Sequence, residues 1–99
     1  MFLAMVILVS TYTRPLEEVD AHRDDHVAFV TRHHEAGRIV VFGRRSPPTG
    51  GVLVCVGVDA DQALEMMAED PYLRAGVATY EPVEFTPSRV TPGLELLTR

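Results

Sequence analysis

The feature that most constrains the fold is the order of apolar segments along the 99 residues. Four runs have the length and the branched or alternating residues of strands: residues 2–9, 38–42, 52–58 and 77–85. Two segments with helical spacing follow the first and third runs. The order β-α-β-β-α-β predicts an α+β, ferredoxin-like domain, with a four-stranded antiparallel sheet and two helices on one face. We place this domain in residues 1–86 and an irregular tail in residues 87–99.

The first helix is expected to begin at Pro15 and to run as one segment to the glycine at position 37. Its buried stripe is predicted from apolar residues at helical spacing, with a phenylalanine at the border: Leu16, Val19, Val27, Val30 and Phe29. Tyr12 is expected in the loop before it.

The second helix is expected to begin at Asp59, whose capping-box partner is Gln62, and to be interrupted by Pro71. Residues 43–51 have the proline and glycine content of a hairpin loop. Pro82 within the last strand predicts a sheet edge or a bulge.

The predicted helices cover only one face of the sheet. Residues 2–9 and 52–58 are apolar on both faces, so the second face must also be covered. The same face of a second subunit is the simplest cover. We therefore predict a homodimer through its sheet faces.

Composition excludes several classes of function. A net charge of −5 without any lysine argues against a nucleic-acid surface. The opening apolar run is about half of the roughly 20 residues that cross a bilayer, and no positive charge precedes it, so neither a membrane span nor a signal peptide is expected. A single cysteine, Cys55, allows no internal disulfide and fits a reducing cytoplasm.

His26 is the first candidate for chemistry, because it falls in line with the predicted buried stripe, and Arg23 lies on the same side. A histidine held against a sheet suits general acid–base catalysis. It is equally compatible with a structural imidazole bonded to a carbonyl group, and position alone does not decide between the two.

His22 and His26 have the i,i+4 spacing of a metal-binding pair, but Arg23 stands where a metalloprotease has glutamate. No third ligand is evident, so no metal site is predicted. His33 and His34 fall in the last helical turn, where a structural role is expected.

Asp70, in the segment "EDPYLRAGV", also has two interpretations. Aspartate followed by proline is a good start for a short helix. The same carboxylate can orient His26 and raise its basicity if the fold brings the two together. The roles are compatible, because a carboxylate has two oxygens.

Three segments together, R-x-x-H from Arg23 to His26, "HEAGRIVVFG" and "DPYLRAGV", resemble the YCII (YciI-like) family. The resemblance covers most of the chain and implies a ferredoxin-like domain in a dimeric α/β barrel assembly. It implies an active site with a His–Asp pair, here His26 and Asp70, with Arg23 and Tyr72 nearby. It also implies small ring compounds as substrates, with dehydrochlorination among the activities.

The chain departs from the family pattern after Gly43, where arginines replace a frequent proline, and in the loop before the first helix. Arg44 or Arg45 can bind a carboxylate or phenolate there, or can simply be solvated.

Two functions remain open: a proton-transferring enzyme, and a non-catalytic module that binds or senses a small ligand. No phosphate-binding loop or nucleotide motif is present, so no cofactor is predicted. Cys55 lies within a valine-rich strand and is not expected to be a nucleophile.

Overall fold

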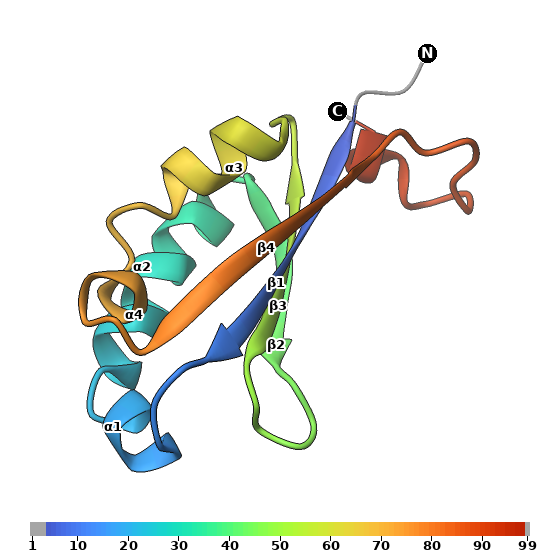
Figure 1. Ribbon diagram of the computed structural model, residues 1–99. Coiled ribbons are helices and arrows are strands. Elements are labelled where there is room, and N and C mark those ends of the chain that lie inside the picture. Colours follow the sequence, from blue (N-terminus) through green and yellow to red (C-terminus); the bar gives the residue numbers. More distant parts are fainter. Residues whose placement is uncertain (1–3, 99) are drawn as a thin grey trace.

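A computed structural model describes residues 4–98, which form a four-stranded sheet with its helices on one side (Figure 1). The strands are β1 (Met5–Tyr12), β2 (Ile39–Arg44), β3 (Gly51–Val56) and β4 (Ala78–Phe85). Their order across the sheet is β2-β3-β1-β4, and each neighbouring pair is antiparallel. This arrangement confirms the predicted ferredoxin-like fold.

Two strand boundaries differ from prediction at the end of the sheet that matters for function. β1 continues to Tyr12, which pairs with Ala78 instead of lying in a loop. β2 continues to Arg44, which pairs with Gly51, so the hairpin loop is shorter than the predicted 43–51. Pairing with a neighbouring strand extends both elements beyond what the local sequence indicates.

The prediction of one long first helix was wrong. The chain forms α1 (Leu16–Asp20) and α2 (Arg23–Glu35), separated at His22, whose φ of −108° and ψ of 5° are not helical. The break decouples the two parts of the predicted stripe. Of the predicted stripe, Val19, Phe29 and Val30 are buried, whereas Leu16 is 38% and Val27 is 37% exposed.

The second helical segment follows prediction closely. α3 (Ala60–Met66) begins with the complete capping box between Asp59 and Gln62, and α4 (Pro71–Arg74) begins at Asp70. The segment "EDPYLRAGV" therefore separates two helices, and the turn after α4 closes at Gly76, whose φ of +71° suits glycine.

The core lies between the sheet and the helices. Alternate residues of β1 and β3 face α2 and α3 there, and the buried cluster comprises Val6, Leu8, Phe29, Val30, Ile39, Leu53, Cys55, Ala63 and Met67. A smaller cluster joins α1, α4 and the start of β4 through Val19, Tyr72, Val77 and Ala78. The end of the sheet between these two clusters holds the pocket described below.

The opposite face of the sheet, which faces away from the helices, carries a row of apolar residues. Across it the register places Ile7 beside Val54 and Val83, and Val54 beside Val41. Val41 is 55% exposed and Val83 is 50% exposed. β4 is an edge strand, as Pro82 predicted.

After β4 the chain leaves the sheet and ends in a short 3-10 turn, η1 (Glu95–Thr98), away from the helical layer (Figure 1). Of the helices in the described part of the chain, none is sufficiently long and apolar to span a bilayer.

Candidate active site

A pocket of about 80 Å³ opens between the sheet and α2, several times the roughly 10–15 Å³ that accommodates one water molecule. All four strands contribute to it, together with α2 and α4, and its lining comprises Ser10, Tyr12, Arg23, His26, Val27, Phe42, Gly43, Arg44, Gly51, Leu53, Tyr72 and Tyr80. Val27, one of the exposed residues of the predicted stripe, is among these lining residues.

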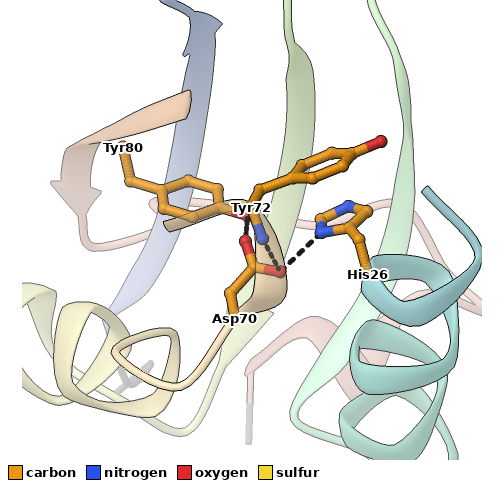
Figure 2. Close-up of polar contacts among 4 residues, drawn as sticks. All are labelled: His26, Asp70, Tyr72 and Tyr80. Carbon is orange, nitrogen blue, oxygen red and sulfur yellow. Dashed lines mark hydrogen bonds and ion pairs between the residues drawn. The ribbon is translucent and has the colours of Figure 1, made fainter. Parts of the chain in front are cut away.

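His26 on the wall of this pocket pairs with Asp70 behind it. Nδ1 of His26 lies 2.6 Å from Oδ1 of Asp70 (Figure 2). The Asp70 side chain is fully buried, and that of His26 is 14% exposed. Sequence reasoning left this contact open, and the fold brings the two residues together across 44 positions of the chain.

Asp70 also serves as a helix cap, so one carboxylate both caps α4 and contacts His26. Its Oδ1 accepts a hydrogen bond from the backbone N–H of Tyr72 at 3.3 Å. Its Oδ2 accepts one from the hydroxyl of Tyr80 at 2.6 Å (Figure 2). A buried carboxylate needs such donors to offset the water it has lost. These two hydrogen bonds, together with the His26 contact, hold the carboxylate in one orientation.

This arrangement selects the tautomer of His26. An ionised carboxylate only accepts hydrogen bonds, so Nδ1 of His26 carries the proton that faces Asp70. In the neutral form of this tautomer Nε2 has the free lone pair, on the side of the ring away from the carboxylate (Figure 2). Such a nitrogen is suited to accept a proton from a bound molecule.

Tyr72 fixes the plane of the His26 ring. The two rings stack with centroids 3.8 Å apart and planes 7° from parallel, and Tyr12 contacts Tyr72 edge to face at 5.9 Å. Burial raises the pKa of Tyr72, and the positive charges of Arg44 and Arg23 oppose that shift. Tyr72 is therefore a neutral phenol near neutral pH.

Arg44 extends from the end of β2 to α1 and is already engaged. Its Nε donates to the hydroxyl of Tyr12 at 3.1 Å, and its terminal nitrogen forms an ion pair with Asp20. The hydrogen bond to Asp20 is the main cause that raises the pKa of Arg44. Arg44 therefore lies at the pocket with Tyr12 and Asp20 as its partners.

The five predicted site residues lie together: four line the pocket, and Asp70 contacts His26 from behind. Sequence reasoning missed Ser10, Tyr12 and Tyr80. A usable signal existed for two of them, because Ser10 and Tyr12 alternate with the core residue Leu8 and so share its face.

The other histidines have different surroundings. Nδ1 of His34 lies 2.7 Å from the carbonyl of Ile39, and His33 accepts a hydrogen bond from Arg38. Within residues 4–98 no three His, Cys, Asp or Glu side chains are grouped so as to hold a metal ion.

Comparisons with known proteins agree with this description. Among solved structures, the chain is similar to 5-chloro-2-hydroxyhydroquinone dehydrochlorinase (TftG) from Burkholderia phenoliruptrix AC1100, in its complex with 2,5-dihydroxybenzoquinone. The TM-score is 0.66 at 15% sequence identity, and the match covers 89% of this chain and 96% of the other. At that identity the likeness shows the fold. A search of curated protein sequences gave no match.

Residues 4–86 match the YCII-related domain, which is most of the chain and includes the complete sheet, all four α-helices and each residue of the pocket. The chain therefore belongs to the YCII-related domain family.

Proposed function

We propose that this protein is a small-molecule enzyme in which His26 transfers a proton and Asp70 orients it. The observation that carries the proposal is the 2.6 Å contact between Nδ1 of His26 and the fully buried Asp70 carboxylate. A buried, hydrogen-bonded carboxylate behind a histidine is the arrangement that enzymes use to activate an imidazole.

In the proposed reaction Nε2 of His26 removes a proton from a substrate carbon or oxygen. The carboxylate of Asp70 stabilises the imidazolium that forms. In an isomerisation or tautomerisation the imidazolium returns the proton to another atom of the substrate. In an elimination the electrons of the broken C–H bond form a double bond, chloride departs, and the imidazolium releases its proton to water. The dehydrochlorinase activity of the similar structure supports the last of these.

The substrate-binding roles go to the polar groups around the imidazole. Tyr72 and Arg23 are proposed to contact oxygens of the substrate from the wall and mouth of the pocket. A guanidinium has five N–H donors. Arg44 can therefore contact an anionic oxygen while it keeps Tyr12 and Asp20 as partners.

We also propose that two copies of the chain form a dimer through their sheet faces. The support is the apolar row of Ile7, Val41, Val54 and Val83 on the face opposite the helices, with Val41 and Val83 at least half exposed. A contiguous apolar face of this kind marks an interaction surface. Light scattering that gives a monomeric mass at micromolar concentration would contradict the dimer.

The function is tested by assaying chlorinated hydroquinones and small cyclic carbonyl compounds, with chloride release and substrate absorbance as readouts. His26→Gln is expected to lower turnover by about 10²–10⁴-fold, the usual contribution of a general acid or base. His33→Gln, on the same helix but outside the pocket, is the matched control and should retain full activity. Saturable binding without turnover in the unmodified protein would instead favour the binding module.

A further inference from the structure

Ser10 is a pocket residue that the proposed proton transfer does not use. It lies on β1 with 2% of its surface exposed, and it is one of two buried polar or charged residues within the described chain. Its hydroxyl has no hydrogen-bond partner among residues 4–98. An unpaired buried hydroxyl is costly, so its presence on the wall of a pocket points to a partner that arrives with a ligand.

The surroundings of Ser10 leave space for that ligand. Tyr80 is its neighbour across the strands, and the hydroxyl of Tyr80 is committed to Asp70. On the other side Gly50 packs so closely that an added Cβ would come within 1.8 Å of the Ser10 carbonyl oxygen. The adjacent Gly51 and Gly43 line the pocket without side chains. Ser10 thus contributes a polar side chain to a part of the pocket wall where Gly43 and Gly51 have none.

The walls indicate the shape of the ligand. Rings of Tyr12, Phe42, Tyr72 and Tyr80 border the pocket beside the His26 imidazole. Aromatic walls favour a flat apolar body. A hydroxyl group both donates and accepts, so Ser10 suits either a hydroxyl or a carbonyl oxygen on the rim of that body.

We infer that Ser10 is the specificity-determining residue of the site: its hydroxyl binds an oxygen substituent of a small planar ring held beside His26. This inference rests on the proposed function only in that it uses the same pocket. It adds the residue that selects the ligand: Ser10 favours oxygenated rings over unsubstituted ones. Sites that hydrogen-bond a substrate hydroxyl discriminate strongly against analogues without it, because their own polar group is then left unpaired.

The test measures the binding of hydroquinone and benzene by NMR titration. Hydroquinone has an oxygen at both ends and so presents one to Ser10 in either orientation, whereas benzene presents none. Ser10→Ala should weaken hydroquinone binding by about 5–10-fold, the value of one hydrogen bond, and change benzene binding by less than about 2-fold. Ser10→Cys, similar in volume but a weak donor, should weaken hydroquinone in the same way.

Thr11→Ala is the matched control, because it removes a hydroxyl from the next, exposed residue of the same strand. It should bind both compounds as the unmodified protein does. Ser10→Ala should also unfold at the same or a higher temperature, since the hydroxyl it removes has no partner within the described protein. A purely structural serine would instead lower the melting temperature.

Three results would overturn the inference: no binding of hydroquinone by the unmodified protein, an unchanged hydroquinone affinity in Ser10→Ala, or an equal loss of affinity for both compounds. Failure of the proposed function is separable. If the selectivity of Ser10 is found but His26→Gln has no effect on any turnover, the substrate class stands and the proton transfer fails. If turnover depends on His26 and the selectivity of Ser10 is absent, the proton transfer stands and the role of Ser10 fails.

Discussion

Removing the hydroxyl of Tyr80 tests whether the Asp70 carboxylate is held by the hydrogen bonds that the structure shows. Tyr80→Phe retains the ring and deletes the donor that lies 2.6 Å from Oδ2 of Asp70. A hydrogen bond to a charged group contributes about 1.5–3 kcal/mol. Because Asp70 is fully buried, no bulk water replaces the lost donor. We expect a loss of about 1.5–3 kcal/mol in the free energy of unfolding, or roughly 6–24 °C in Tm for a domain of this size.

The assay is a double-mutant cycle of urea unfolding with Tyr80→Phe, Asp70→Ala and the combined variant. The cycle isolates the interaction of the two side chains from other effects of each substitution. A coupling free energy below about 0.5 kcal/mol would show that the Tyr80 hydroxyl does not hold the Asp70 carboxylate, since residues in one hydrogen-bond network couple by more than that.

The hydrogen bond between Tyr80 and Asp70 also predicts how the stability of the protein depends on pH. Burial, followed by the charge of Asp70, raises the pKa of Tyr80. The folded protein therefore binds more protons than the unfolded chain above the ordinary tyrosine pKa of about 10. The contribution of Tyr80 to stability is complete below that pH and is lost as the pH rises. In Tyr80→Phe this alkaline loss should be smaller, and an identical pH profile in both proteins would contradict the assignment.

Three further predictions concern other parts of the fold. Burial raises the pKa of the Cys55 thiol to about 11, so a thiol reagent at pH 8 should modify it only after urea unfolding; rapid labelling of the native protein would contradict its burial. Val83→Asp on the open face of the sheet should convert the proposed dimer to a monomer in light scattering without unfolding it, and an unchanged mass would place the interface elsewhere. Gly50→Ala should destabilise the protein by at least about 1–3 kcal/mol, because a Cβ there would lie 1.8 Å from the Ser10 carbonyl oxygen. Gly43→Ala, which meets no atom within 4 Å, is its control in the same thermal melts, and equal melting temperatures would contradict the close approach.

Local signals in the sequence predicted those elements that short-range chemistry determines. The capping box at Asp59 and the Asp70–Pro71 helix start involve residues at most three positions apart, and both are present in the structure. The order of apolar runs likewise predicted the sheet, because alternation with period two or 3.6 depends only on neighbouring residues.

The break between α1 and α2 was not predictable from the same signals. No glycine or proline marks it, and His22 adopts non-helical angles within a sequence that permits a continuous helix. Tertiary packing compensates for the helical hydrogen bonds lost at the break. Val19 on α1 is fully buried against Tyr72, Val77 and Ala78. Such contacts override local helical preference.

The site was predicted in part for a similar reason. His26 and Asp70 were found through their positions and the family resemblance, but their contact spans 44 residues of sequence. Tyr80 and Ser10 come together through the register of β1 with β4, which no local pattern specifies. The ion pair of Arg44 with Asp20 depends on where α1 lies after the helix break, so the engagement of that arginine was also missed.

We propose that Asp70 fixes the protonation of the His26 ring, and ¹⁵N-resolved NMR of the imidazoles is the direct test. We expect Nδ1 of His26 to carry a slowly exchanging proton in the unmodified protein. In Asp70→Asn that resonance should be lost or strongly shifted, while the signals of His33 and His34 stay unchanged. A proton on Nε2 alone in the unmodified protein, or an identical His26 spectrum in Asp70→Asn, would contradict the account.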